Sequence, residues 1–387
     1  MSAGQELQGP MVRGCPQTGV RDLMSKVFIV DLEAVETRYT GQWKTHIPDL
    51  LRKENCHVEV IAGPEDIPKA TTPGAFLNFG GTNIYKSRQI EQIGRLFCSG
   101  SVSAGDHFLF TDAWHPGIIN LKYMSELLGI PVKIHAMWHA GSYDPQDFLG
   151  RLIGDTPWVR HAEKSFYHAI DHNYFATEFH IEMFCKNLLG YENSSIVRQF
   201  APAKIIRTGW PFENLEQVIK QDVVDGTKRN LILFPHRLAP EKQVEIFRDL
   251  AGSMPEYDWV ICQEQALTKQ QYHRMLGEAK LVFSANLQET LGISMYEGLC
   301  AGAAALVPRR LSYTEQYHTP FVYPSSWTES WAKYQTHKSD LIKTIKNLMD
   351  NLHKEEYIEQ IHAQQQYLTK EFFSATMLWR KLLGPNK

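Results

Sequence analysis

The sequence lacks any apolar run near the roughly 18 to 20 residues that span a bilayer, and no basic segment followed by an apolar stretch opens it. We therefore expect a soluble cytoplasmic protein with no integral membrane segment, in the host cytoplasm if the source is viral. The six cysteines include no CxxC pair, so neither a zinc site nor a disulfide framework is expected. The formal net charge is −3, and this absence of a basic excess argues against a dedicated nucleic-acid-binding domain.

The length of 387 residues exceeds the size at which one hydrophobic core usually keeps growing, so two domains are expected. Short apolar runs alternate with stretches of helical periodicity, which is typical of an α/β protein with parallel sheets. The strand-like runs of the first half include residues 26–31, 57–61, 107–111 and 131–135, and helices are expected at 41–53 and 118–128. Ligands in such sheets bind at the carboxyl ends of the strands.

The second half repeats the alternation after a break rich in Gly, Pro and polar residues. Strands are expected at 230–234, 258–262, 281–284 and 304–307, with helices from about 241 to 253, from 269 to 278 and from about 292, and residues 341–383 helical throughout. We divide the chain into a leader or expression remnant (1–23), an acceptor-side domain (24–212), a donor-binding domain (226–360) and a C-terminal helix (361–387) that packs back on the first domain.

Two cations follow the strand at 230–234. Arg237 and Lys242 lie five residues apart across a Pro-containing turn, where both can reach one phosphate group. Arg binds two phosphate oxygens at once and Lys adds a point charge, so together they stabilise a leaving diphosphate. Taken alone, this segment is better explained as a solvated loop with two ordinary surface charges.

Two carboxylates give a more specific pattern. Glu289 and Glu297 flank Gly292, at which a helix is expected to begin after the strand at 281–284. The glycine permits close approach of the backbone, and a helix N-terminus attracts phosphate. Carboxylates accept hydrogen bonds from hydroxyl groups, so one can bind a sugar and the other a ribose.

This pattern resembles the C-terminal motif of the retaining GT-B glycosyltransferases related to glycogen and sucrose synthases and to bacterial lipopolysaccharide transferases. The matching residues, across about residues 230–310, are Arg237, Lys242, Glu289, Gly292, Ile293, Glu297 and Gly298. The resemblance implies a GT-B fold, with two Rossmann-like, doubly wound domains facing a central cleft. It also implies that Arg237 and Lys242 bind the diphosphate of a nucleotide-sugar donor, that Glu289 contacts the sugar, and that Glu297 holds the ribose.

Three departures indicate a divergent member, for which a viral, bacteriophage source is one explanation. The segment Gln288, Glu289 and Thr290 lacks the usual Gly-Phe, Ser294 replaces a proline, and His236 replaces a glycine. The family's glycine-rich loop after the first strand is represented only by Gly41 and its neighbours. Thr290 and Glu264 complete the expected donor-binding residues.

The first half offers weaker candidates. His139, with His135 as the runner-up, resembles a family histidine that faces the transferred sugar, although a histidine packed in a loop explains the residue equally well. An aromatic and histidine cluster is expected on the acceptor side, unless its tryptophans have a plain core role. This cluster contains Asp112, Trp114, His115, Trp138 and Tyr143.

The resemblance implies transfer of a hexose or pentose with retention of anomeric configuration, with a UDP-sugar favoured as donor and no obligatory metal. The acceptor is left open between a saccharide, lipid or other small molecule and a hydroxymethylated DNA base. A base-flipping enzyme needs only a local basic rim, which could come from Lys86, Arg88 and Arg95 or from Arg151, Arg160 and Lys164. The pattern is also compatible with a sugar-nucleotide epimerase of the same fold and with an inactive nucleotide-sugar-binding protein.

Overall fold

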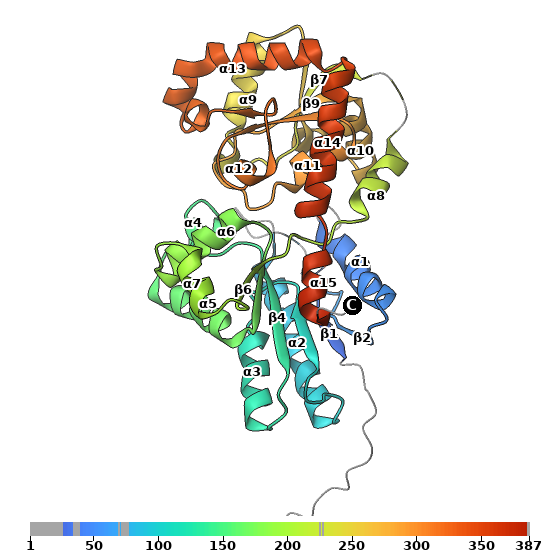
Figure 1. The fold of residues 1–387 in the computed structure, drawn as a ribbon, viewed down its shortest axis with the longest axis vertical. Helices are drawn as coiled ribbons and strands as arrows, with labels where there is room; N and C mark the ends of the chain where they lie inside the picture. Colours follow the sequence, from blue (N-terminus) through green and yellow to red (C-terminus); the bar gives the residue numbers. More distant parts are fainter. Residues whose placement is uncertain are drawn as a thin grey trace, which may run out of the picture.

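The computed structural model describes residues 26–33, 39–68, 70, 77–223, 226 and 228–384. The leader expected at residues 1–23 lies outside them. The described residues form two units, each built on a parallel sheet, as the doubly wound α/β interpretation predicted (Figure 1). None of the helices in the described part of the chain is both long and apolar enough to cross a membrane.

The first unit contains a six-stranded sheet of order β2-β1-β3-β4-β5-β6, in which every pairing is parallel. Its strands are β1 (Val27–Val30), β2 (Val58–Ile61), β3 (His107–Phe110), β4 (Lys133–Trp138), β5 (His172–Phe175) and β6 (Ile205–Arg207). Its helices are α1 (Tyr39–Lys53), α2 (Phe79–Cys98), α3 (Gly117–Leu127), α4 (Phe148–Leu152), α5 (Pro157–Ala169), α6 (Glu178–Met183), the π-helix η1 (Phe184–Leu189) and α7 (Ser194–Phe200). Strands β1, β3, β4 and β5 each end in at least three consecutive buried residues, as expected of strands covered on both faces.

The second unit contains a five-stranded parallel sheet of order β11-β10-β9-β7-β8. Its strands are β7 (Arg229–Phe234), β8 (Asp258–Ile261), β9 (Ala279–Phe283), β10 (Ala304–Pro308) and β11 (Val322–Tyr323). Its helical segments are α8 (Leu215–Asp222), η2 (Pro240–Lys242), α9 (Val244–Ser253), η3 (Cys262–Gln265), α10 (Lys269–Glu278), α11 (Ile293–Cys300), α12 (Tyr313–Gln316), η4 (Ser325–Thr328), α13 (Trp331–Asn351) and α14 (Glu355–Glu371).

Two sequence expectations in this half are wrong in detail. The helix expected from about residue 241 begins only at Val244, because Gln243 adopts a left-handed conformation with φ 53° and ends the 3-10 turn before it. Residues 341–383 are not helical throughout, since α13, α14 and the last helix α15 (Thr376–Leu383) are separated by short breaks. Residue 361, the expected start of the C-terminal helix, falls inside α14.

The chain passes twice between the units, and the two passages touch. Figure 1 shows α14 beside the second sheet and α15 beside the first, so the C-terminal segment returns to the first unit. At the crossing the Trp210 amide donates to the Phe372 carbonyl at 2.9 Å. Gly209 adopts a φ of +65°, and a Cβ atom there would lie 2.7 Å from the same carbonyl oxygen. This contact holds the two connecting segments against each other.

Candidate active site

A cleft of about 760 Å³ is lined by residues of both units. Several of them follow strand ends directly: Glu33 comes after β1, Asp112 after β3, His139 after β4 and Pro235 after β7. The cleft therefore occupies the position expected for a ligand site of two parallel sheets, outside the carboxyl ends of their strands.

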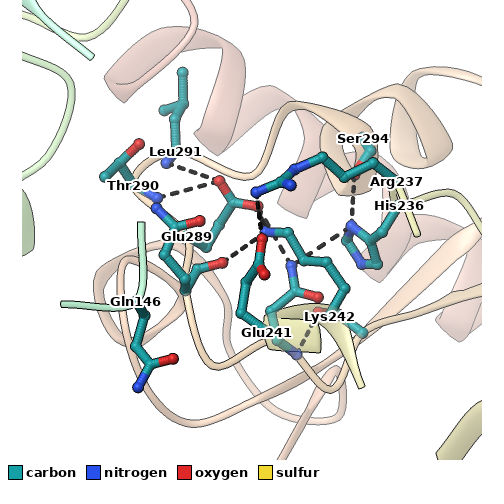
Figure 2. A network of polar contacts seen from close by, with 12 residues as sticks. Gln146, His236, Arg237, Glu241, Lys242, Glu289, Thr290, Leu291 and Ser294 are labelled. Atoms are coloured by element: carbon teal, nitrogen blue, oxygen red, sulfur yellow. Dashed lines mark hydrogen bonds and ion pairs between the residues drawn. The ribbon is translucent and has the colours of Figure 1, made fainter. Parts of the chain in front are cut away.

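Lys242 and Glu289 form an ion pair in the cleft wall of the second unit (Figure 2). The Lys242 Nζ lies 3.4 Å from the Glu289 Oε2 and donates to the Gln288 carbonyl at 2.6 Å, and only 7% of the lysine side chain is exposed. Burial acts to raise the pKa of Glu289, but Lys242, His236 and two backbone amides outweigh it and lower that pKa below its ordinary value. Glu289 is therefore an ionised carboxylate beside a buried cation.

Arg237 extends along the same wall and contacts Glu241. The Glu241 side chain is 1% exposed and also accepts a hydrogen bond from Arg151 of the first unit, with 2.6 Å between Nη1 and Oε2. One buried carboxylate thus binds two arginines, one from each unit. Arg237 keeps 34% of its side chain exposed, so it can still contact a ligand in the cleft.

His236 and Ser294, two of the positions at which the sequence departs from the family pattern, contact each other. The Ser294 hydroxyl lies 3.1 Å from Nδ1 of His236, and both residues line the cleft. Burial and the nearby Lys242 lower the pKa of His236 to about 3, so the imidazole is neutral at physiological pH.

Gly292 positions the first turn of α11. Its φ is +78°, a region that favours glycine, and a Cβ atom there would lie 2.9 Å from Cε1 of Tyr313. The loop before it folds back on Glu289, whose Oε1 accepts hydrogen bonds from the amides of Thr290 and Leu291 at 3.1 and 3.4 Å. Ile293 and Ser294, the first two residues of α11, line the cleft at the positive end of the helix dipole.

Thr290 joins the two units. Its hydroxyl donates to the His139 carbonyl at 3.2 Å, and its own carbonyl accepts from the Thr177 hydroxyl at 2.9 Å. His139 itself lines the cleft, with its Nε2 2.6 Å from the Thr111 carbonyl and its ring packed on Trp210. The contact therefore brings the candidate histidine of the first unit next to the Glu289 loop of the second.

The first unit's side of the cleft combines one ion pair with apolar surface. Lys86 Nζ lies 2.9 Å from Oδ2 of Asp112, and both line the cleft with Trp114. Burial acts to raise the pKa of Asp112, but Lys86 and His139 outweigh it and hold that pKa at about 2. Glu33 is also buried here, accepting from the Thr82 hydroxyl.

Four residues expected at the donor do not line the cleft: Gly292, described above, and Glu297, Glu264 and Gly41. Glu297, one turn along α11, accepts a hydrogen bond from the Tyr272 hydroxyl at 2.9 Å. Glu264 is paired with Arg248 on the exposed surface at 2.5 Å. Gly41 lies in the first turn of α1 rather than in a glycine-rich loop.

Three of the expected acceptor-side residues lie in the packed interior of the first unit. Trp138 is fully buried and donates to Asn173 at 2.8 Å, the Tyr143 hydroxyl contacts His180 at 2.7 Å, and His115 contacts Gln89 at 3.0 Å. The runner-up His135 is likewise fully buried, within β4. Of that aromatic and histidine cluster only Asp112 and Trp114 line the cleft.

The sequence reasoning missed Glu33, Glu241 and the contact between His236 and Ser294. Glu33 could have been found, because it follows the first strand at its carboxyl end. Glu241 lies in the same segment as Arg237, but no role was predicted for it. The contact between His236 and Ser294 depends on how β7 and α11 pack, which a local sequence pattern does not predict.

The two groups of cations considered as a DNA rim are mostly paired. Arg88 and Arg95 both bind Glu91, Arg160 binds Asp155, and Lys86 and Arg151 bind Asp112 and Glu241. The charge of these five side chains is therefore offset locally rather than presented as a basic surface.

Solved structures with the same architecture span almost the whole chain. The catalytic domain of starch synthase IV from Arabidopsis thaliana, bound to ADP and acarbose, matches with a TM-score of 0.50 at 11% identity, covering 90% of this chain and 99% of that chain. Sucrose-phosphate synthase from Thermosynechococcus elongatus matches with a TM-score of 0.56 at 8% identity, covering 93% and 96%.

A glycosyltransferase from Rickettsia africae matches with a TM-score of 0.54 at 11% identity, covering 92% of this chain and 96% of that chain. The structural neighbours are GT-B glycosyltransferases, and at these identities the likeness establishes the fold: two Rossmann-like units in the GT-B arrangement. None of these findings supports a viral source. No protein-family model and no curated protein sequence matches the chain.

Proposed function

We propose that the chain is a retaining glycosyltransferase that moves a sugar from a nucleotide-diphosphate sugar to an acceptor hydroxyl. The observation that carries this proposal is the buried pair of Lys242 and Glu289, which lines the cleft with Arg237 beside it. The cation suits the anionic diphosphate of a nucleotide sugar, and the ionised carboxylate suits the hydroxyl groups of its sugar.

The diphosphate binds Arg237 and Lys242. Charge builds on the leaving diphosphate in the transition state, and cations already positioned beside it stabilise that charge. The N-terminus of α11 adds a positive dipole end. These groups neutralise the leaving group without an obligatory metal ion.

The sugar binds Glu289, whose lowered pKa keeps it ionised and therefore an acceptor for sugar hydroxyls. His139 faces the transferred sugar from the first unit, held near the Glu289 loop by the contact with Thr290. Glu297 holds the ribose, for which the Tyr272 hydroxyl would have to share or yield its hydrogen bond. Retention follows if the acceptor hydroxyl attacks on the face that the diphosphate leaves.

The acceptor binds on the first unit's side of the cleft, near Trp114 and the pair of Lys86 and Asp112. A saccharide or other small molecule fits this surface better than DNA, because five of the six cations considered for a basic rim already bind carboxylates. Both UDP-sugars and ADP-sugars are reasonable donors, since one structural neighbour was solved with ADP.

A thermal-shift screen against UDP-, GDP-, ADP- and CDP-sugars tests the proposal, since a ligand at 100 times its Kd stabilises the folded state by about 2.7 kcal/mol. We expect one nucleotide sugar to raise the Tm, and Arg237→Ala and Glu289→Ala to lose that shift. Arg248→Ala, which removes an exposed arginine of the same unit, is the matched control and keeps the shift. No shift with any donor overturns the proposal.

Product analysis separates a transferase from an epimerase and from an inactive binding protein. A transferase needs an acceptor for turnover and yields a product whose anomeric configuration, read by NMR, equals that of the donor. An epimerase converts the nucleotide sugar with no acceptor present, and an inactive binding protein shows the thermal shift without turnover.

A further inference from the structure

The first unit lines its half of the cleft with apolar side chains from segments that are far apart in the sequence. They come from the start of α2, the loop after β3, α4 with the residue that follows it, and the first turn of α5. Each of them keeps part of its surface exposed. This surface, called the apolar wall below, contains Leu77, Phe79, Trp114, Leu149, Ile153 and Trp158.

The two tryptophans of the wall show that it is both held in place and open. Trp114 donates from its Nε1 to Oε1 of Glu163 at 2.8 Å, and its ring packs edge-on against Phe166 with 5.5 Å between the centroids. Glu163 is fully buried, so it holds the ring of Trp114 from inside the unit. Trp158, in the first turn of α5, is 59% exposed. Such a large exposed aromatic side chain in a cleft marks a surface for an apolar ligand group.

The side chains of the wall offer few partners for hydroxyl groups. Nε1 of Trp114 already donates to Glu163, and the nearby Lys86 already donates to Asp112 and to the Trp114 carbonyl. A saccharide carries a hydroxyl group on most of its ring carbons, and each one that is buried without a partner costs free energy. An apolar group on the same surface is stabilised by the area that it removes from water. The wall therefore favours an apolar group over a sugar ring.

The wall is connected to the proposed donor site through two strand ends. Asp112 and His139 follow the neighbouring strands β3 and β4, and both line the cleft. The His139 carbonyl accepts a hydrogen bond from Thr290, the residue after Glu289. On the other side, the Trp114 amide donates to Oδ1 of Asp112 at 3.0 Å. An acceptor hydroxyl near the donor sugar therefore lies at Asp112 and His139, and the rest of the acceptor extends onto the apolar wall.

We propose that the acceptor is amphipathic: its reacting hydroxyl lies at Asp112 and His139, and an apolar group, either an aromatic ring or a short alkyl chain, packs on the apolar wall with Trp158 as a specificity-determining residue. The proposal rests on the proposed function and narrows the acceptor class. In the transfer, the acceptor oxygen bonds to the anomeric carbon while the bond from that carbon to the diphosphate breaks, and the hydroxyl proton leaves with the nucleoside diphosphate.

Methyl, hexyl and phenyl β-glucosides test the inference, because they carry the same glucose ring and differ only in the apolar group. Titration calorimetry on the full chain, saturated with the nucleoside diphosphate of the preferred donor, gives Kd for each glucoside. We expect the hexyl or the phenyl glucoside to bind at least tenfold more tightly than the methyl glucoside, or about 1.4 kcal/mol. Tighter binding of the hexyl compound identifies an alkyl chain, and tighter binding of the phenyl compound identifies a ring. Equal affinities, or no binding of any glucoside, overturn the inference.

Variants of Trp158 show whether the preference arises at the wall. Trp158→Ala should reduce it to less than threefold, while Kd for the methyl glucoside and for the nucleoside diphosphate stays within twofold of the wild type. Trp158→Phe, which keeps an apolar ring, should retain most of the preference. Trp331→Ala is the matched control, since Trp331 is 45% exposed on the second unit and does not line the cleft.

An equal loss for all three glucosides in Trp158→Ala would place this residue at the shared glucose ring and overturn its assignment to the apolar group. Failure of the wild type to bind any nucleoside diphosphate overturns the proposed function instead, and the glucoside series repeated without nucleotide distinguishes the two failures.

Discussion

Arg151 of the first unit and Glu241 of the second form an ion pair, with 2.6 Å between Nη1 and Oε2, and the almost fully buried carboxylate of Glu241 also binds Arg237. In the proposed function Glu241 competes with the diphosphate for Arg237. A buried carboxylate near an anion site also repels the ligand directly, because charges interact strongly where water is excluded. The two contacts of Glu241 with Arg151 and Arg237 are therefore expected to lower the affinity for the anion.

Glu241→Gln should therefore tighten binding of the nucleoside diphosphate by about threefold to tenfold, or about 0.7 to 1.4 kcal/mol. Titration calorimetry at low salt measures the effect, and Glu264→Gln, which neutralises an exposed carboxylate of the same unit, should leave Kd unchanged. Weaker binding by Glu241→Gln would show instead that this carboxylate holds Arg237 in its binding position.

Glu289→Gln should separate sugar recognition from diphosphate recognition. The amide cannot accept hydrogen bonds as a carboxylate does, so kcat/KM for the nucleotide sugar should fall about 100-fold, or about 2.7 kcal/mol. Affinity for the free nucleoside diphosphate should stay the same or improve, since a negative charge is lost next to Lys242.

Glu297→Gln provides the comparison for this variant. If Glu297 holds the ribose, the variant weakens binding of the free nucleoside diphosphate and the nucleotide sugar by the same factor, because both ligands contain ribose. A loss of free diphosphate affinity in Glu289→Gln would remove Glu289 from its proposed role at the sugar.

The sequence predicted well those features that depend on local order. Residues that follow strands or flank the start of α11 were identified from their positions together with the family resemblance, and Arg237, Lys242, Glu289 and His139 all line the cleft. Strand alternation could also have corrected one error: Trp138 precedes His139 in the chain, so its side chain points to the opposite face of the sheet.

Other features depend on long-range packing and could not be predicted. Helix α2 was overlooked because polar residues interrupt its apolar stripe, and the structure buries three of them, Thr82, Lys86 and Gln89, against strand-end residues. Thr290 was expected at the donor, but its bonds to His139 and Thr177 exist only because the two units meet.

Asp31 should make the free energy of unfolding depend on pH, in a direction that follows from its pKa. Burial raises the pKa of its carboxyl from 3.8 to about 6, although the Tyr85 hydroxyl opposes the shift. The folded state therefore binds more protons than the unfolded state between these values, and the contribution of Asp31 to stability falls as the pH rises from about 4 to 6. From pH 4 to pH 7 the loss should be about 2 kcal/mol.

Urea unfolding at pH 4 and pH 7 measures this effect as a difference between variants. The stability of Asp31→Asn relative to the wild type should increase over that interval. Asp112→Asn is the control of opposite sign: the pKa of Asp112 is lowered to about 2 by Lys86 and His139 against the effect of burial, so its contribution is lost only as the pH falls below about 4. The relative stability of that variant should be nearly constant from pH 4 to 7. A constant difference for Asp31→Asn would contradict the assignment.

Gly292→Ala should be destabilising because it adds a Cβ atom where the backbone and its neighbours leave no room. The φ of +78° costs an L-residue about 1 to 2 kcal/mol, and the 2.9 Å approach to Cε1 of Tyr313 adds to it. Gly94→Ala is the matched control, since Gly94 lies inside α2 with open space around its Cβ position and should gain up to about 1 kcal/mol from helix propensity. Urea unfolding of both variants measures the difference in stability. Because the loop that ends at Gly292 contains Glu289, Gly292→Ala should also lose most of its activity. Equal stabilities of the two variants would mean that the loop relaxes to accept a side chain, and that the start of α11 is not fixed by this glycine.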